Sequence, residues 1–499
     1  MNYNNYSLYK IDMTTTAHFQ KKPDFYPTVE ECKNASRMKI VSNPRYNEFK
    51  QTHFTAGDED QFQEYRDPSN GEVCIPRINL NENKFEDIDL ESTVAWAKYQ
   101  NLNATCVNNT FSYMFHKFKK GLFIKIQNNK LKVFLPFSKK GFINEWGNKI
   151  NIDPKFGSMY NFVKYINKLE GKSYKVSVNR FTDNWYGNNC LVRSEYPINE
   201  GDTNAANMSD MIKTLCEKRK VPDMEFFINR RDFPVIKRNS TEAYDHMFGD
   251  SHPLLSHEYD QYSPILSMVT ADGYADIPIP TGDDWARIGS YQGKFFGKDC
   301  KSYPKVEDFT IKWDNKKPTA VFRGKSTGCG VTVDTNVRLK LAYISATTPP
   351  DVDGPLLDAG ITKWQLRPRK LKWEKYLQTI NIPEMNKLGI HLTSFLTPLQ
   401  QSGYKYLIHV DGHVSAFRLS LEMSMGCCIL LADSKYRLWF RSLMKPMVEY
   451  VPVKEDLSDL IEKIKWCRAN DKKCKKIAKN ARKFYLKYLQ EDGALDYIQ

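Results

Sequence analysis

Short apolar strands alternate with amphipathic helices over the second half of this chain, and that alternation limits the folds it can adopt. Strand-like runs lie at 318–324, 405–412 and 426–433, and helical patterns lie at 335–345 and 456–470. Parallel strands cannot be joined by a tight turn, so each pair needs a crossover connection, which is commonly a helix. The pattern therefore predicts an α/β fold with a doubly wound, mostly parallel sheet.

The preceding stretch repeats this pattern. A helical run (NMSDMIKTLCEKRK, 207–220) is followed by a strand (MEFFIN, 224–229), and the alternation in GLFIKIQNNKLKVFLPF predicts a β-hairpin that turns at Asn128 and Asn129. Two such α/β units, joined near 300–317, predict two Rossmann-like lobes that face one another. Residues 1–107 are polar and rich in turn signals, which indicates an irregular extension.

The chain is strongly basic, with a formal net charge of +14 over 499 residues. This charge favours anionic partners, which could be nucleic acid, a membrane surface or a phosphorylated small molecule. Much of the excess lies in 473–489, whose apolar residues recur at helical spacing, so its lysines are interpreted as the solvated face of an amphipathic helix. No zinc finger, RNP aromatic pair or repeated basic module accompanies them, and nucleic acid is not an expected partner.

Targeting and metal-binding signals are not found in the sequence. No apolar run reaches the roughly 18–20 residues of a membrane span, and neither a signal peptide nor a retention tetrapeptide is present. The eleven cysteines form no CxxC pair and no Cys/His cluster of metal-site spacing. A cytoplasmic or otherwise intracellular protein without structural zinc is therefore expected.

Two segments place phosphate-binding side chains at strand ends. In the first, Arg323 could donate to a phosphate while Gly324 lets the backbone approach a ligand. In the second, the Asp411-Gly412 turn is expected to lead into a helix whose first turn holds Ser415 and Arg418, and a helix amino end favours anions. The competing interpretation is that Ser415 only caps this helix and Arg418 is a surface arginine.

A third segment offers a general base. Asp232 leaves the strand 224–229, is held by Pro234, and is flanked by arginines. A carboxylate at a strand exit could accept a proton from a hydroxyl group. The alternative is an ordinary loop carboxylate paired with Arg230 or Arg231.

In combination these motifs resemble the CAP-like family of O-glucosyl- and O-xylosyltransferases, which includes the Rumi protein, the KDEL-motif-containing enzymes and fungal capsule xylosyltransferases. The matching stretches are INRRDFP, DIPIP, AVFRGKSTG, YKYLIHVDGHVSAFRLSLEMSMGCCILL and YRLWFRSLMKPMVEYVPVKEDLSDLIEKI. The resemblance extends over about 220–489. It implies a GT-B fold, with the acceptor side in 108–316 (which also holds the hairpin as an accessory element), the UDP-sugar lobe in 317–470, and a terminal helix in 471–499 that packs back on the first lobe.

The resemblance also implies roles for individual residues. Asp232 takes the position of the catalytic base. The remaining matched positions belong to UDP-sugar and diphosphate binding, and they are Arg323, Gly324, Lys325, Arg338, Asp411, Gly412, Ser415 and Arg418. Lys325, Met447 and Glu449 depart from the family pattern, which puts the donor preference and the local packing in question.

The implied reaction is an inverting transfer, without a metal or other cofactor, of glucose or xylose from a UDP-sugar to a hydroxyl group on protein or glycan. Asp351-Val352-Asp353 lies in a proline-rich stretch and is interpreted as a turn rather than a metal-binding DxD motif. Lipid acceptors stay open as an alternative. A second alternative is a binding protein that keeps the fold, has lost turnover, and uses its basic surface on nucleic acid or another anionic partner.

Overall fold

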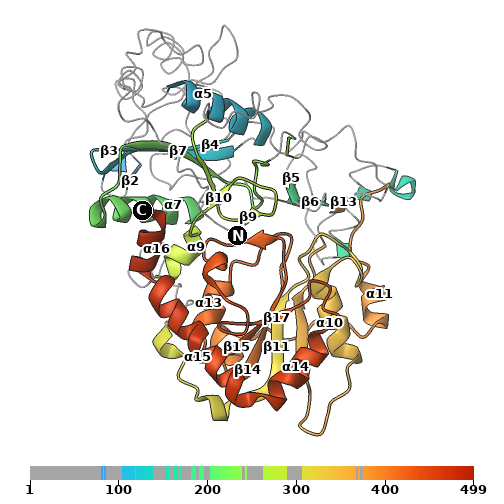
Figure 1. Cartoon of the computed structure of the whole chain (residues 1–499). Coiled ribbons are helices and arrows are strands. Elements are labelled where there is room, and N and C mark those ends of the chain that lie inside the picture. The colour runs from blue at the N-terminus through green and yellow to red at the C-terminus, as the bar shows by residue number, and fades with distance from the viewer. Residues whose placement is uncertain are drawn as a thin grey trace.

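The computed structural model describes part of the chain (Figure 1). The described residues are 80–81, 84–85, 104–118, 120–138, 153–157, a few positions between 161 and 169, 181–186, 190–195, 203–238, 242–243, 262–288, 306–366, 369–370 and 375–499. The predicted extension at 1–107 lies almost wholly outside them. Its predicted boundary falls within helix α5 (Ala104–Tyr113), which continues as a π-helical turn at Met114–Phe118.

An all-parallel five-stranded sheet forms the lower half of the molecule in the view of Figure 1. Its strand order is β12-β11-β14-β15-β17. The strands are β11 (Lys317–Lys325), β12 (Leu357–Lys363), β14 (Tyr404–His409), β15 (Cys428–Ala432) and β17 (Val451–Val453). The parallel sheet predicted from the alternating pattern is therefore confirmed. The centres of its strands are apolar and buried, as at 320–322, 406–408 and 428–432, because both faces of a parallel sheet are covered.

A second five-stranded sheet is mixed, with the order β10-β8-β7-β3-β4. Its strands are β3 (Lys120–Gln127), β4 (Lys130–Ser138), β7 (Met224–Asn229), β8 (Ile265–Ser267) and β10 (Ile277–Pro278). The predicted hairpin is confirmed: Asn128 and Asn129 both have positive φ angles, as a two-residue turn between twisted strands requires. Contrary to the prediction of an accessory element, β3 pairs directly with β7, so the hairpin forms part of this sheet.

Helices cover the parallel sheet and connect its strands. On one face, α10 (Val337–Thr347), α14 (Leu460–Ala469) and the first half of α15 (Asp471–Tyr488) bury one continuous apolar cluster against β11, β14 and β15. Two shorter helices, α11 (Ile382–Lys387) and α12 (Pro398–Gln401), lie in the connection from β12 to β14.

The second half of α15 belongs to a cluster that includes both sheets' helices. Phe484 and Tyr485 are buried with Met211 and Leu215 of α7 (Thr203–Lys218) and with Trp285 of α9 (Gly282–Arg287). The final helix α16 (Glu491–Ile498) then contacts α7, and Arg219 binds Asp492 and Asp496 at 2.9 and 2.8 Å. The terminal helices therefore join the two sheets.

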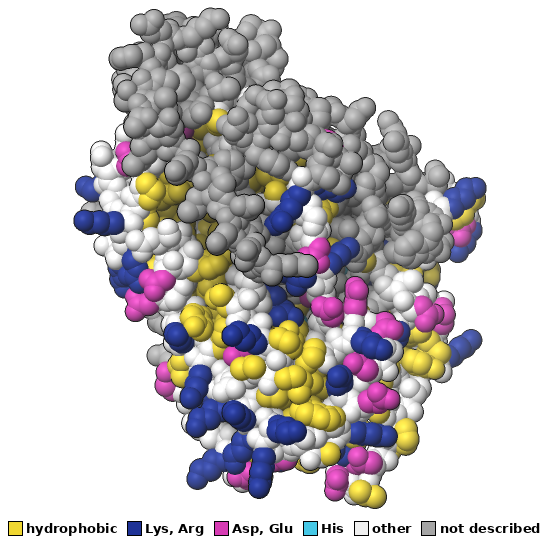
Figure 2. Space-filling view, viewed as in Figure 1, with side chains coloured by type: hydrophobic (Ala, Val, Ile, Leu, Met, Phe, Trp, Pro, Cys, Tyr) yellow, Lys and Arg dark blue, Asp and Glu magenta, His cyan; other side chains and the backbone are white. Residues whose placement is uncertain are grey.

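The predicted amphipathic helix at 473–489 is confirmed as α15. Its apolar side is buried, and its exposed side chains include Lys472, Lys473, Lys475, Lys476, Lys479, Lys483 and Lys487. Figure 2 shows basic side chains gathered at the lower left, over this helix.

Two helix starts differ from the prediction. Helix α13 covers only Leu419–Ser424, and Ser415 lies in the preceding irregular segment rather than in a first helical turn. The carboxylate of Asp411 accepts from the backbone N–H of Ala416, which holds this segment outside the helix. Helix α14 begins after Asp459 rather than at 456, and Asp456 instead accepts from Ser458 N–H within the preceding turn.

Small sheets complete the described fold. The strands β5 (Phe181–Tyr186), β6 (Cys190–Glu195) and β13 (Arg369–Lys370) form an antiparallel sheet. Strand β16 (Tyr436–Arg437) pairs with β9 (Thr270–Ala271), and this bridge links the segment after β15 to the segment after β8. A two-stranded piece pairs β1 (Leu80–Asn81) with β2 (Lys84–Phe85). Within the described residues no helix is both long and apolar enough to cross a membrane.

Candidate active site

The order of the parallel sheet places a topological switch point at the carboxyl ends of β11 and β14, and we call the region outside these two strand ends the crevice. These two neighbours lie where the chain reverses its direction of winding, since β12 is added on one side of β11 and β14, β15 and β17 on the other. In open α/β sheets ligands bind outside the carboxyl ends of the strands at this switch point. Strand β11 ends at Arg323-Gly324-Lys325, and β14 leads into Asp411-Gly412. The structure therefore brings together two motifs that are far apart in sequence.

Arg338 occupies the space between these strand ends. It lies at the start of α10, which Asn336 caps, and its guanidinium donates to the carbonyl oxygens of Asp411 (2.9 Å) and Lys325 (3.2 Å) and to the Thr327 hydroxyl. Desolvation, followed by the charge of Arg418, lowers the pKa of Arg338 to about 9. Two guanidinium groups that repel one another in a partly desolvated site stabilise an added anion.

The two glycines of this crevice make room for Arg338. A Cβ atom on Gly412 would lie 2.9 Å from the Thr327 hydroxyl oxygen and 3.3 Å from Nη2 of Arg338. A Cβ atom on Gly324 would lie 2.8 Å from the Phe322 ring and 3.6 Å from Nη1 of Arg338. Both distances under 3.0 Å require the neighbour to move, so glycine at these positions is a steric requirement of the packed crevice.

Arg418 completes the basic cluster. Its guanidinium carbon lies 4.8 Å from the centre of the Phe322 ring, Nη1 donates to the carbonyl oxygen of Arg323 at 2.7 Å, and 28% of the side chain is exposed. Glu422 orients it through an ion pair at 2.9 Å and also contacts His409 Nδ1 at 2.5 Å. Burial alone would raise the pKa of Glu422, but its contacts with His409 and Arg418 lower it. His409 is thus a buried residue that supports Glu422.

Asp411 contacts Arg338 in the same crevice through its carbonyl oxygen, and Ser415 and Lys325 belong to the two chain segments that border it. Burial raises the pKa of Asp411, although its carboxylate accepts from the Ser434 hydroxyl and from Ala416 N–H. The Ser415 hydroxyl is half-buried and has no hydrogen-bond partner in the described part of the chain. Lys325 is exposed and makes no ion pair with any described residue.

Arg323 is placed differently from the other predicted residues. Side chains alternate along a strand, so it lies on the face of β11 opposite to Phe322. Its guanidinium pairs with Asp358 at 2.8 Å, and it also donates to the carbonyl oxygens of Ser394 and Asp358. The backbone of Arg323 reaches the crevice through its contact with Arg418, whereas its charge is balanced by Asp358.

Asp232 lies on a loop whose backbone is held by buried hydrogen bonds. The Asn229 side chain donates to Phe233 O at 2.7 Å, and buried Asp276 accepts from the backbone N–H groups of Val235 and Ile236, both at 2.8 Å. Burial raises the pKa of Asp276 to about 6, although these two hydrogen bonds and a third from the Ser267 hydroxyl lower it. The loop therefore has little freedom to move.

The Asp232 side chain is exposed on this loop. Its carboxylate makes no hydrogen bond or ion pair with any residue that the structure describes. The flanking Arg231 is instead buried, with its Nε donating to Phe118 O at 2.8 Å. The simple alternative of a carboxylate neutralised by its neighbouring arginine is therefore wrong for Arg231.

Asp283 was missed from the sequence and lies near Asp232. Burial raises the pKa of Asp283, and the negative charges of Asp284 and Asp232 raise it further, while Arg287 lowers it. The signal was available, because Thr281-Gly282-Asp283-Asp284 is a capping-box pattern at the start of α9. A motif of this kind predicts a helix start, but it does not show that the helix faces another carboxylate.

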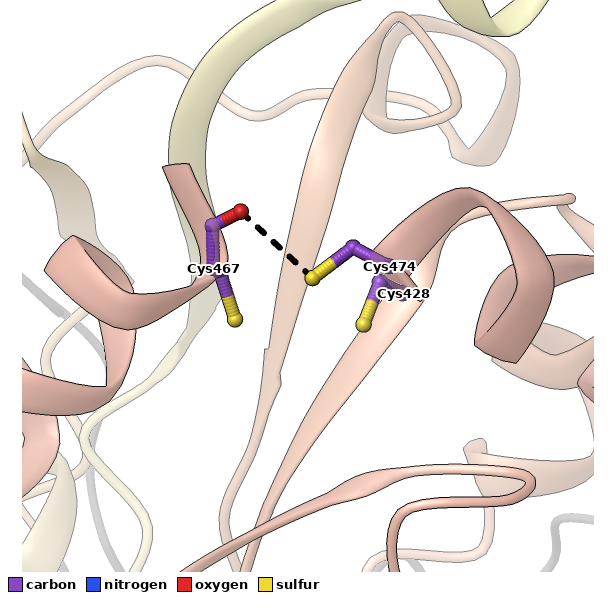
Figure 3. A group of neighbouring side chains, drawn as sticks. All are labelled: Cys428, Cys467 and Cys474. Atoms are coloured by element: carbon purple, nitrogen blue, oxygen red, sulfur yellow. Dashed lines mark hydrogen bonds between the residues drawn. The ribbon is translucent and has the colours of Figure 1, made fainter. Parts of the chain in front are cut away.

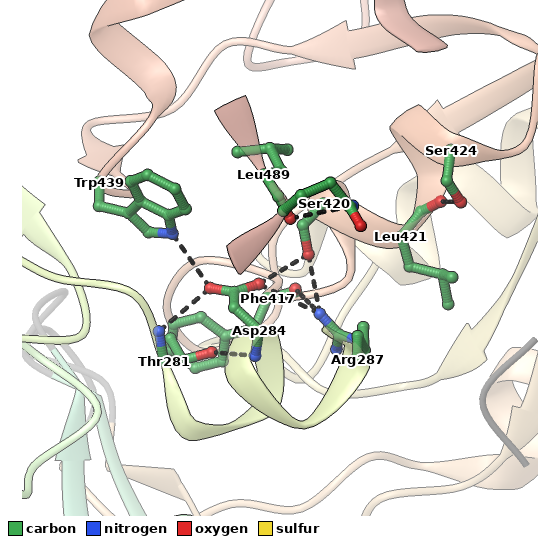
Figure 4. A network of polar contacts seen from close by, with 10 residues as sticks. Thr281, Asp284, Arg287, Phe417, Ser420, Leu421, Ser424, Trp439 and Leu489 are labelled. Atoms are coloured by element: carbon green, nitrogen blue, oxygen red, sulfur yellow. Dashed lines mark hydrogen bonds and ion pairs between the residues drawn. The ribbon is translucent and has the colours of Figure 1, made fainter. Parts of the chain in front are cut away.

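A polar network ties α9 to α13 (Figure 4). The Asp284 carboxylate accepts from the Ser420 hydroxyl at 2.7 Å and from the Trp439 indole at 3.2 Å. Arg287 donates to Ser420 Oγ at 2.8 Å and to Phe417 O at 3.2 Å. Phe417 immediately precedes Arg418, so α9 connects the carboxylate at 283 to the start of the segment that carries the crevice arginine. No sequence pattern predicted this network.

Metal-binding groups do not gather around this crevice among the described residues. Asp351 and Asp353, predicted to form a turn, do so: Asp351 accepts from Asp353 N–H and pairs with Arg468. The three cysteines at 428, 467 and 474 are the described group with metal-site geometry, and they lie at the opposite edge of the sheet.

This geometry defines the class of the protein as a doubly wound α/β protein with a basic crevice at its switch point. Residues 202–499 match the family model named glycosyl transferase family 90. Since the match covers more than half of the chain, the chain belongs to this family. The resemblance to the Rumi-like and CAP-like glycosyltransferases is thereby confirmed.

Individual relatives include viral and animal proteins. Uncharacterized protein 179R of Invertebrate iridescent virus 6 is 49% identical over 92% of this chain, and protein O-glucosyltransferase 3 of Homo sapiens is 30% identical over 54% of it. The chain spans less than half of each relative's length, 42% and 44% respectively. Among solved structures, Anabaena HepE in complex with UDP aligns with 39% of this chain and 53% of its own, at 13% identity and a TM-score of 0.27. A likeness that weak has no bearing on the site.

Proposed function

We propose that this chain transfers a sugar, glucose or xylose, from a UDP-sugar to a hydroxyl group on a protein or glycan acceptor, with inversion and without a metal. The proposal rests on membership of glycosyl transferase family 90 and on the naming of several relatives as protein O-glucosyltransferases. The observation that carries it is the pair of arginines at the switch point of the parallel sheet, Arg338 and Arg418.

The donor diphosphate would lie against this pair. Arg418 leaves 28% of its side chain exposed, Ser415 offers a hydroxyl that has no partner among the described residues, and Lys325 adds an exposed side chain. Negative charge grows on the leaving diphosphate during transfer, and fixed cations in a desolvated site stabilise it without reorganising. Such groups replace the metal that many nucleotide-sugar enzymes use. Arg323 would support the crevice through its backbone and its Asp358 pair rather than hold phosphate itself.

Asp232 would act as the general base. Its exposed carboxylate on a fixed loop is free to accept the acceptor hydroxyl's proton, a role worth about 10² to 10⁴ in rate.

The two sheets would form the two lobes of a GT-B enzyme. In this arrangement the mixed sheet (within 108–316) receives the acceptor, the parallel sheet (within 317–470) binds the donor, and the terminal helices (471–499) brace them. The α9–α13 network of Asp284, Arg287 and Ser420 would set the distance between base and diphosphate.

The test separates binding from chemistry. UDP should raise the melting temperature of the protein, and a screen of UDP-glucose, UDP-xylose, UDP-galactose and UDP-N-acetylglucosamine with acceptor should release UDP from one donor. Asp232→Asn should lose about 10²-fold or more in transfer rate and keep UDP binding. Asp272→Asn is the matched control, because this exposed aspartate pairs with Arg437 outside the crevice. Wild-type turnover in Asp232→Asn would refute the base, and UDP binding without turnover of any donor would favour the inactive binding protein.

A further inference from the structure

Three buried cysteines converge at the amino edge of the parallel sheet (Figure 3). Cys428 starts β15, Cys467 lies near the end of α14, and Cys474 lies in the first turns of α15. All three side chains are fully buried, and their sulfur atoms lie within 4.8 Å of one another. The group could not be recognised from the sequence, because Cys428 is distant in the chain from the other two cysteines and Cys467 and Cys474 do not have CxxC spacing.

The spacing suits a shared metal ion. An ion bound at about 2.3 Å from each of three sulfurs holds those sulfurs about 4 Å apart. The observed separations need only a small contraction, and the backbone elements that carry the cysteines are already packed together in one apolar cluster. Thiolates select soft cations such as Zn²⁺ and Cu(I).

A buried orphan hydroxyl supplies an independent observation. The Tyr406 side chain is fully buried in β14, and its hydroxyl has no hydrogen-bond partner among the described residues. Leaving such a group unsatisfied costs about 1–3 kcal/mol. Tyr406 pairs with Cys428 across the neighbouring strands β14 and β15, and it belongs to the same buried cluster as the three cysteines. An oxygen at this position could complete a four-coordinate Zn²⁺ site.

We propose that Cys428, Cys467 and Cys474 form a thiolate site for a soft metal ion, either Zn²⁺ with Tyr406 as a fourth ligand or three-coordinate Cu(I). Binding releases the thiol protons to solvent and changes no oxidation state. The ion would fasten the α14–α15 junction to β15, at the edge of the sheet opposite to the crevice. This proposal departs from the expectation, drawn from cysteine spacing, that the protein lacks structural zinc, and it is independent of the proposed transfer reaction.

The experiment measures metal content and stability of the full chain. The protein is purified under reducing conditions without chelator and is then incubated with Zn²⁺ or with Cu(I) in separate samples. Elemental mass spectrometry should then find about one ion per chain. Cys467→Ser and Cys474→Ser should each lower this to below about one tenth. Cys427→Ser is the matched control, because Cys427 is buried next to Cys428 but contacts Lys316 instead. Loss of the ion in Cys427→Ser to the same extent would overturn the site.

A second measurement uses only the wild-type protein, so it tests the site even if the cysteine variants do not fold. A chelator should lower the melting temperature of the wild-type protein, and returning the ion that the content assay identifies should restore it. Co²⁺ should give the near-ultraviolet charge-transfer band of a thiolate complex. A wild-type chain that holds neither ion, shows no cobalt band and keeps its melting temperature in chelator would refute the proposal, as would a disulfide between two of these cysteines under the same reducing conditions.

Discussion

Arg418 offers the sharpest test of the crevice. It is the arginine of the cluster that is both exposed, by 28% of its side chain, and fixed by protein contacts, namely Glu422 and the carbonyl oxygen of Arg323. Arg418→Met removes the charge while it keeps an apolar stem over Phe322. If the guanidinium donates to the diphosphate, UDP binding should lose one charged hydrogen bond, about 1.5–3 kcal/mol, which is roughly a 10- to 150-fold rise in Kd.

The assay is titration of UDP by calorimetry, alongside thermal unfolding of each variant. Arg418→Lys keeps the charge but not the two-pronged geometry, so its Kd should fall between wild type and Arg418→Met. Removing Arg418 also leaves Glu422 with His409 as its remaining partner, so some loss of stability is expected in both variants. Arg437→Met serves as the control, since Arg437 pairs with Asp272 at the surface. A Kd for Arg418→Met within twofold of wild type, in a folded protein, would refute the assignment of this crevice to the donor.

Three further predictions concern the packing of the site and its support. Gly412→Ala should cost about 1–3 kcal/mol of stability and weaken UDP binding, because the new Cβ would meet Thr327 and displace Arg338; unchanged values in urea unfolding and calorimetry would contradict the packing. Asp276 has a folded-state pKa of about 6, raised above its ordinary 3.8, so its contribution to the free energy of unfolding should fall by about 3 kcal/mol as the pH rises from about 4 to 6. Asp276→Asn should flatten this pH dependence of stability. An unaltered pH profile in the variant would show that Asp276 is not its cause. Lys125→Met should lower the free energy of unfolding by about 3–5 kcal/mol, because it removes the cation that pairs with buried Glu225 on the facing strand. In chemical denaturation the double variant Lys125→Met with Glu225→Leu should recover most of this loss. Equal losses in the single and double variants would show that the ion pair is not the cause.

The local pattern of the chain was sufficient for much of the secondary structure. The strand at 224–229, the hairpin turn at Asn128-Asn129 and helix α10 all lie where periodicity and turn chemistry placed them. These features depend on neighbouring residues: positive φ angles at asparagine and an apolar stripe at helical spacing are properties of a short segment. The start of α13 was misplaced because a side chain outside that segment's helix, Asp411, binds the backbone at Ala416.

Long-range contacts decided the rest. A sequence indicates that Gly324 and Gly412 each follow a strand, but only the order of the sheet makes those strands neighbours and leaves space for Arg338 between them. In the same way, Asp284 meets Ser420, and Cys428 meets Cys467 and Cys474, only because separate elements pack together. The sequence by itself determined most of the strands and helices and the family to which the chain belongs. Only the tertiary structure decided which charges, glycines and thiols share a site, because hydrophobic burial is non-directional and fixes partners only once the elements have packed.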